Sequence, residues 1–449
     1  MKKLLPLFIS AALGSMSTSA FADSLAEIYD LAKQNDPQLL SVAAQRDQAF
    51  EAITSSRSAL LPQINLTAGY NLTRGDTEYD SNLVNDVSNL VNDVSNDANA
   101  LTAGVSFSQA LYNRASWISL DTAEKSARQA DATYAATQQA LILRVSQAYF
   151  EVLRAQDNLV FVRAEKAAVG RQLEQTKQRF EVGLSAITDV HDAQAQYDQV
   201  LADEVLAENA LTNSYESLRE ITGQEHKDLN ILDTRRFTAS PSTVPAESLI
   251  DEAKTKNLTL LSSRILQDIA RDNISLASSG HLPTLSLDGG YNYGDTSHSS
   301  RDNTTDNFNI GVNLAVPLYT GGNVTSQTKQ AEYAYVAASE DLEAQYRSVV
   351  KDVRAQNNNI NASIGALRAY EQAVISARSA LEATEAGFDV GTRTIVDVLD
   401  ATRRLYDANK NLSNARYDYI LSVLQLRQAV GTLSEQDILD VDAGLKAAK

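Results

Sequence analysis

The sequence contains no cysteine, which excludes disulfides, thiolate metal sites and an amino-terminal lipid attached through cysteine. Basic residues are outnumbered, since 39 lysines and arginines stand against 57 acids and leave a net charge of −18. A chain this acidic is not expected to bind nucleic acid. No later segment offers the ~18 uninterrupted apolar residues of a membrane-spanning helix, so we expect no helical membrane span.

Residues 1–22 have the three parts of a bacterial secretory signal. Two lysines precede an apolar run from Leu4 to Leu13, and Ala20-Phe21-Ala22 supplies the small residues of a cleavage site. We therefore expect an exported protein whose mature chain begins near Asp23.

Proline is scarce as well, and residues 63–240 and 318–449 contain none. Long helices can run through such tracts without interruption. From Leu141 to Phe180 a mostly apolar seam advances in steps of four and three, which is typical of a coiled coil. The pattern predicts a helix from about residue 113 to 180 and another from 323 to about 386.

An internal duplication organises the chain. The segment from Phe180 to Ala193 returns 208 residues later as Phe388 to Ala401. We expect two structural repeats that each contain a long helical hairpin, with short turns at 181–186 and 389–394. The expected domains are a signal at 1–22, a first repeat at 23–223 with its hairpin at 113–222, a linker at 224–257, a second repeat at 258–431 with its hairpin at 323–431, and a terminal segment at 432–449. A repeated backbone favours a scaffold or conduit over a catalytic pocket; a soluble coiled-coil rod is the alternative.

Four segments alternate apolar and polar residues with the period of a β-strand. They span about 62–74, 99–112, 283–294 and 306–319, so each is long enough for a tilted transmembrane strand, which needs ~9–11 residues. Polar stretches at 75–99 and 295–306 are expected to be irregular extracellular loops. A soluble sheet with one buried face explains the alternation equally well strand by strand. If the strands lie in lipid, four are too few to close a barrel, so several chains must pool them into 8, 12 or 16 strands.

Together with the signal, strands and hairpins, several motifs closely resemble the TolC family of outer-membrane efflux and secretion channels. They include Asn35-Asp36-Pro37, His281-Leu282-Pro283-Thr284 and the run from Gly391 to Asp400. The resemblance implies an α+β membrane protein in the outer membrane of a Gram-negative bacterium. It implies a homotrimer with a 12-stranded transmembrane β-barrel, continued into the periplasm by a 12-helix α-barrel. The segments 224–257 and 432–449 would form an equatorial domain.

By this resemblance, Asp397 and Asp400 form an acidic ring at the pore constriction. Three residues apart on a helix, they share one face, and threefold symmetry would gather their carboxylates where cations are attracted and block the pore. Mutual repulsion would raise their proton affinity. The alternative is an acidic helix start favoured by the helix dipole.

The resemblance also assigns a gate latch. Arg393 would reach Thr188 and Asp189 of the neighbouring hairpin. Phe388 departs from the family pattern, in which a tyrosine hydroxyl bonds the acid at the position of Asp189. That hydrogen bond cannot form here, so we expect either that closure depends more on Arg393 and on packing or that the resting gate is looser.

The turns at Gly183 and Leu184 and at Gly391 and Thr392 would dock a periplasmic membrane-fusion adaptor. Through it, an inner-membrane transporter of the RND, ABC or MFS type would use the chain as a passive exit duct for drugs, small toxic molecules or proteins, with outer-membrane lipid around the barrel. No cofactor or metal is expected.

Two other classes of protein compete with the duct. A trimeric outer-membrane adhesin also pools a 12-stranded barrel, but its strands lie together at the carboxy terminus rather than in two separate pairs. An enzyme is disfavoured, since the four histidines are scattered and no nucleotide-binding or nucleophile motif occurs.

Overall fold

In the computed structural model, residues 23–77, 94–95, 97–241, 244–298 and 301–447 are described. The expected signal at 1–22 lies outside them. The chain divides into two compact units, one made of 42–135 and 258–348 and the other of 1–41, 136–257 and 349–449. Each unit therefore draws on both halves of the duplicated sequence.

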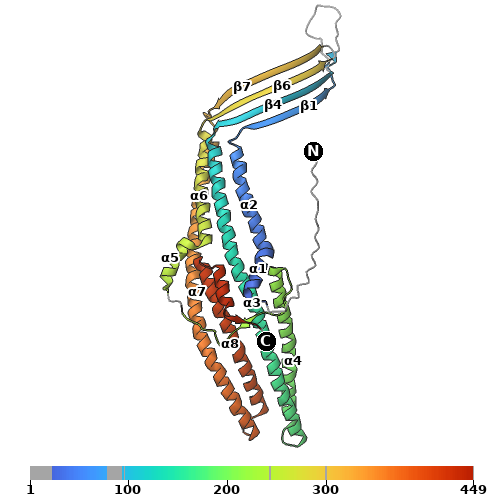
Figure 1. The fold of residues 1–449 in the computed structure, drawn as a ribbon, viewed down its shortest axis with the longest axis vertical. Coiled ribbons are helices and arrows are strands. Elements are labelled where there is room, and N and C mark those ends of the chain that lie inside the picture. The colour runs from blue at the N-terminus through green and yellow to red at the C-terminus, as the bar shows by residue number, and fades with distance from the viewer. Residues whose placement is uncertain (1–22, 78–93, 96, 242–243, 299–300, 448–449) are drawn as a thin grey trace, which may run out of the picture. The chain divides into compact units, whose positions relative to one another are not determined.

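A four-stranded antiparallel sheet dominates the first of these units (Figure 1). Its order is β1-β4-β6-β7, so the two halves of the chain meet where β4 pairs with β6. The strands are β1 (Gln63–Thr73), β4 (Ala98–Tyr112), β6 (Thr284–His298) and β7 (Arg301–Ala315). Among the described strands, β1 and β7 each keep one edge without a hydrogen-bonded neighbour.

The strand register gathers apolar side chains in rows on one face of the sheet. Leu66 lies opposite Val105, Val105 opposite Tyr291, and Tyr291 opposite Phe308. The adjacent row, on the other face, is polar or small and consists of Asn65, Ser106, Gly290 and Asn309. Phe308 is 74 % exposed and Leu66 77 % exposed, so this face needs an apolar environment outside the chain.

The structure corrects the expected strand ends. Residues 295–298 and 301–306 are strand rather than irregular loop, because β6 continues to His298, β7 begins at Arg301, and Thr296 pairs with Asn303. Residues 299–300 lie outside the described chain. Threonine, serine and asparagine on both faces hid this extension, since they show no apolar alternation. β7 ends at Ala315 rather than 319, and Pro317, which has no N–H for a ladder, follows closely.

The first expected loop, 75–99, is also partly paired. The short strands β2 (Asp76–Thr77) and β3 (Val94–Ser95) form an antiparallel pair, and β4 begins at Ala98. Residues 78–93 and 96 lie outside the described chain. The interpretation of this stretch as irregular is therefore wrong at its two ends.

The two longest helices that were not predicted from the sequence are α2 (Pro37–Ser58) and α6 (Leu258–Ser278). Each begins directly after a shorter helix has ended at an extended residue, Asp36 before α2 and Asn257 before α6. α2 begins with Pro37. Proline suits the first position of a helix because the N–H that it lacks would have no partner within the helix there. Their places in the two halves correspond, so they belong to the duplication.

The hairpins form as expected, to within a few residues. The first joins α3 (Arg114–Glu181) to α4 (Ile187–Thr222), and the second joins α7 (Asn323–Asp389) to α8 (Ile395–Val430). Gly223 and Gly431 end α4 and α8 in the left-handed conformation, with φ of 72° and 88°. Figure 1 shows both hairpins turning at α3–α4 and α7–α8.

Short elements pack on the hairpins in the second unit. They are α1 (Leu25–Asn35), β5 (Ile231–Leu232), α5 (Ala246–Lys256), α9 (Glu435–Asp442) and β8 (Leu445–Lys446). β5 pairs with β8, so the segments expected to be equatorial, 224–257 and 432–449, do meet. α1 joins them, since the Leu25 amide donates to Asp442 Oδ1 at 2.9 Å; the sequence analysis did not assign it there. Residues 242–243 and 448–449 lie outside the described chain.

Buried aromatic residues anchor α3 in this unit. Tyr149 and Phe150 are both fully buried, and the Tyr149 hydroxyl donates to the Asn230 carbonyl at 2.6 Å. Desolvation, added to the nearby charges of Asp442 and Asp23, raises the pKa of Tyr149 above its usual value, so the hydroxyl stays a donor.

Candidate functional site

The two hairpin turns are built alike. Gly183 and Gly391 both adopt φ of 77°, a left-handed conformation that favours glycine. After each glycine the chain closes the preceding helix with one backbone bond of 2.8 Å, from Leu184 to the Arg179 carbonyl and from Thr392 to the Gly387 carbonyl. The duplication is thus preserved in the hydrogen bonding of the turns.

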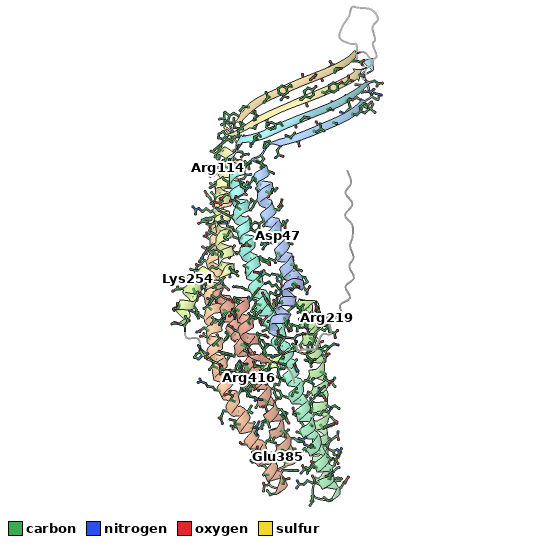
Figure 2. All side chains as sticks on the ribbon, in the orientation of Figure 1. Asp47, Arg114, Arg219, Lys254, Glu385 and Arg416 are labelled. Atoms are coloured by element: carbon green, nitrogen blue, oxygen red, sulfur yellow. The ribbon has the colours of Figure 1, made fainter. Side chains whose placement is uncertain are left out.

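Apolar side chains stand exposed at both turns. Val182 is 69 % exposed and Leu184 72 % in the first, and Val390 is 75 % exposed in the second. Figure 2 shows Glu385 near the second turn, where polar side chains also stand out from α7. The two turns therefore expose apolar as well as polar side chains.

Asp397 caps the start of α8. Its Oδ2 accepts from the Thr394 amide and the Thr394 hydroxyl, both at 2.9 Å. The backbone bond and then the hydroxyl bond from Thr394 lower the pKa of Asp397 below its usual value. Asp189 does the same for α4, accepting from the Ala186 amide at 3.1 Å. Within one chain Asp397 is therefore an acid at a helix start, which is the alternative that the sequence left open. Both of these hydrogen bonds go to Oδ2, and Oδ1 takes no part in the cap.

Asp400 lies one turn further along α8, and both aspartates are partly exposed. Its carboxylate is within reach of two arginines of the same helix, Arg403 at 3.3 Å and Arg404 at 3.9 Å. These two arginines, which were not among the predicted site residues, reduce the net charge of this segment of α8.

The latch residues are not all together within one chain. Thr188 is exposed, and Asp189 Oδ2 accepts from Ser185 Oγ at 2.7 Å. Among the described residues, Arg393 makes no ion pair; its side chain passes so close to Gly387 that a Cβ there would lie 2.8 Å from Arg393 Cγ. The chain alone does not bring Arg393 to Thr188 or Asp189.

Phe388 has a partner that the sequence analysis missed. The Arg179 guanidinium lies 4.6 Å from the centroid of the Phe388 ring and 3.6 Å from the Asp389 carboxylate. Arg179 is on α3 and the other two are on α7, so this contact, here called the Arg179 clasp, joins the two hairpins of one chain. The one signal for it in the sequence is a difference between the repeats. The first half has Arg179 where the second half has Gly387, so the arginine belongs to one hairpin only.

The clasp sits beside a small apolar core shared by all four hairpin helices. Val169 and Ala193 of the first hairpin are fully buried against Ile395 and Leu399 of the second, and Phe388 packs on the same cluster. The aromatic ring therefore contributes packing in addition to its contact with Arg179.

No described helix is both long enough and apolar enough to cross a membrane. In the part of the chain that the structure describes, no group of three or more acids, histidines or cysteines is arranged to hold a metal ion.

Comparison with known proteins gives consistent matches. The family model described as "Outer membrane efflux protein" matches residues 28–224 and 249–432. The "Outer membrane protein TolC" of Vibrio cholerae is 75 % identical over the full length of both chains. The "Alkaline protease secretion protein AprF" of Pseudomonas aeruginosa is 29 % identical, covering 98 % of this chain and 90 % of the relative. Among solved structures, the Campylobacter jejuni CmeC outer membrane channel aligns with a TM-score of 0.75 at 16 % identity, over 99 % of this chain and 98 % of that one. At that identity the structural match shows the fold alone.

Proposed function

Because the chain belongs to the outer membrane efflux protein family, we propose that it is an outer-membrane exit duct that serves both efflux and type I secretion. The family is described by efflux and one relative, AprF, is named for the secretion of a protease, which supports both cargo classes. The observation that carries the proposal is the sheet, whose exposed apolar rows suit lipid while its other face suits water.

The duct is a homotrimer. Four strands with two open edges cannot close in lipid, where every backbone group needs a partner. Pairing β1 of one chain with β7 of the next satisfies both edges and closes a barrel of twelve strands with threefold symmetry. The adhesin gains no support, since the strand pairs 63–112 and 284–315 remain separated by a whole helical hairpin.

The hairpin turns are the periplasmic gate. A periplasmic membrane-fusion adaptor docks on the exposed residues around Gly183, Leu184, Gly391 and Thr392 and couples the duct to an inner-membrane transporter of the RND, ABC or MFS type. Asp397 and Asp400 line the constriction, and Arg393 pairs with Thr188 and Asp189 of a neighbouring chain. The partly free carboxylates of the two capping aspartates support these assignments.

Deletion of the gene from the bacterium that encodes it tests the proposed function. We expect increased sensitivity to dyes, detergents and antibiotics, together with loss of proteins exported by type I secretion. Purified protein should also conduct ions across a planar lipid bilayer. Unchanged drug sensitivity and unchanged secretion, combined with a protein that carries no current, would contradict the exit duct.

The Arg179 clasp is expected to help hold the gate closed. Arg179→Ala removes the contact with Phe388 and the ion pair with Asp389, each worth about 0.5–1 kcal/mol or less at an exposed site. Three copies in a trimer should raise the conductance of the isolated channel several-fold, as measured in a planar bilayer.

Arg179→Lys serves as the matched variant, because it keeps the charge and loses the flat guanidinium. It should fall between the wild type and Arg179→Ala. Arg393→Ala should raise conductance too, but by breaking contacts between chains. The free-energy effects of the two alanine substitutions on gate closure should therefore add in the double variant. Equal conductance of Arg179→Ala and wild type would remove the clasp from the gate.

A further inference from the structure

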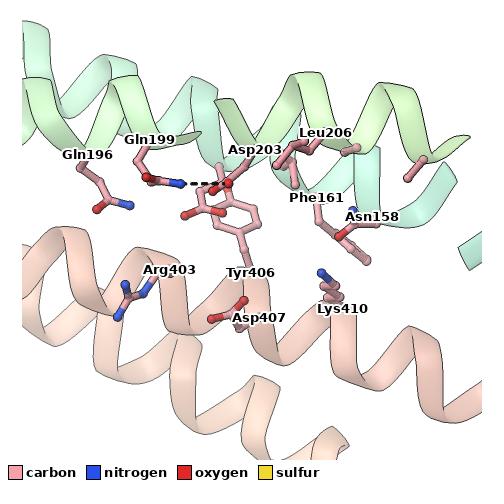
Figure 3. Close-up of a pocket in the computed structure, with 14 residues that line it drawn as sticks. Asn158, Phe161, Gln196, Gln199, Asp203, Leu206, Arg403, Tyr406, Asp407 and Lys410 are labelled. Atoms are coloured by element: carbon pink, nitrogen blue, oxygen red, sulfur yellow. Dashed lines mark hydrogen bonds between the residues drawn. The ribbon is translucent and has the colours of Figure 1, made fainter. Parts of the chain in front are cut away.

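A cavity of about 730 Å³ lies where α8 faces α3 and α4 (Figure 3). All of its walls belong to one unit of the chain, and none of the residues assigned above to the turns, the latch or the acidic pair lines it. Its size falls within the ~300–1,000 Å³ of typical small-molecule sites. The duct function as proposed does not use it.

Three acids from three different helices converge on this cavity, Glu165 of α3, Asp203 of α4 and Asp407 of α8. Among the described residues, Glu165 and Asp407 form no ion pair and no side-chain hydrogen bond, while Asp203 accepts from Gln199 at 3.0 Å. Arg403 and Lys410 contribute two positive charges from α8, and Arg403 already pairs with Asp400. The acids thus exceed the free bases.

A buried acceptor also lacks a partner. Asn158 lines the cavity, and its Oδ1 is shielded from solvent without a hydrogen bond. Leaving such a group unpaired costs roughly 1–3 kcal/mol, so a guest that lets the Asn158 amide turn toward a donor in the cavity would provide a contact that the protein alone does not. Figure 3 shows Asn158 on the cavity wall with Lys410 on the α8 side.

The electrostatics favour a guest of positive charge. Burial, and then the charges of Asp407 and Asp203, raise the pKa of Glu165 to about 7, against the opposing effect of Arg403 and Lys410. The ionised carboxylate is therefore poorly compensated in the empty cavity. A cation placed beside it would offset both the desolvation cost of the charged carboxylate and the repulsion between the acids.

The remaining walls are apolar or aromatic, with Phe161, Leu206 and Tyr406 among them. In Figure 3 the Tyr406 side chain extends from α8 toward the helices opposite. Aromatic faces attract organic cations as well as apolar surface. The three acids are not arranged to hold a metal ion, so the chemistry points to an organic guest.

We propose that this cavity binds an organic cation, an amine carried on an apolar or aromatic body. The ammonium group lies between Glu165 and Asp407, while the body packs against Phe161, Leu206 and Tyr406. A guest there contacts both hairpins of the chain, so its binding is linked to the arrangement of α8 against α3 and α4.

Calorimetric titration of the full-length protein in detergent with naphthylethylamine tests the site. At pH 8 we expect saturable binding that Glu165→Gln weakens about tenfold or more, because the amide oxygen can still accept a hydrogen bond but the negative charge opposite the ammonium is lost. Glu174→Gln on the same helix is the matched control and should bind like the wild type, since Glu174 lies outside the cavity. Naphthylethanol, which keeps the shape without the charge, should bind about tenfold more weakly than the amine.

Proton release gives a second readout. At pH 7, where a group with a pKa of about 7 is half protonated, binding of the amine should expel up to about half a proton from Glu165, measured by repeating the titration in buffers of different ionisation enthalpy. Affinity should fall by up to about tenfold per pH unit below 7 in the wild type and stay flat in Glu165→Gln. Equal binding of amine and alcohol, or equal affinity of wild type and Glu165→Gln, would overturn the proposal.

Discussion

Phe308→Arg is expected to prevent the protein from accumulating as folded trimers in the outer membrane. Phe308 lies at the middle of β7 in a row of apolar side chains that crosses all four strands, and it is 74 % exposed in the single chain. An arginine that faces lipid at the bilayer midplane costs about 2–4 kcal/mol. In a trimer the cost arises three times, about 6–12 kcal/mol in all, which is comparable to the whole stability of a typical fold.

The neighbouring position supplies the control for this experiment. Asn309 belongs to the opposite, polar face of the same strand, so Asn309→Arg should assemble nearly as well as the wild type. Assembly is measured as the heat-modifiable trimer on gels of outer-membrane fractions. Normal trimers of Phe308→Arg, or equal loss in both variants, would show that the apolar face does not meet lipid.

Asp397→Asn combined with Asp400→Asn is expected to remove most of the cation selectivity of the channel. Asparagine keeps the hydrogen-bonding shape, so the cap of α8 survives while its charge is lost. With two carboxylates from each of three chains gone, the permeability ratio of potassium to chloride should fall roughly tenfold, and block by multivalent cations should weaken similarly. Planar-bilayer reversal potentials measure the ratio.

The duplication provides the comparison for the acidic pair. Asp189 and Asp192 are the counterparts of Asp397 and Asp400 in the first hairpin, and changing both to asparagine should alter selectivity much less. If the change at Asp189 and Asp192 removed the selectivity instead, the constriction would lie on the first hairpin and the assignment of Asp397 and Asp400 would be wrong. The low pKa of Asp397 predicts that its charge persists as the pH falls from neutral, until the pH reaches a value below the usual range of an aspartate.

Much of this fold could be predicted because its periodicities are long. A seam repeated over ten turns and an 11-residue alternation such as Gln63–Thr73 leave little choice of secondary structure. The repeat then fixed where each hairpin turns, since Gly183 and Gly391 share one context. Strand ends were missed where threonine and asparagine replaced apolar residues, as between 295 and 306.

The contacts of the candidate site were harder to predict. The sequence shows Phe388 where the family has a tyrosine, but only the packing of α3 on α7 reveals that Arg179 lies over its ring. The cavity at Glu165 depends on three helices whose relative rotation no local pattern encodes. The helices α2 and α6, like the short α1, lie inside the two expected repeats, but the sequence did not predict them as separate elements.

The matched lengths of the hairpins restrict how such a chain can evolve. α4 and α8 have 36 residues each, and α3 and α7 have 68 and 67. One residue inserted into a single helix would displace its far end by about 1.5 Å and turn its face by about 100°. Insertions and deletions among descendants should therefore accumulate between the strands, and any lengthening of the hairpins should arise in both halves together, in steps of about seven residues that restore the facing side chains.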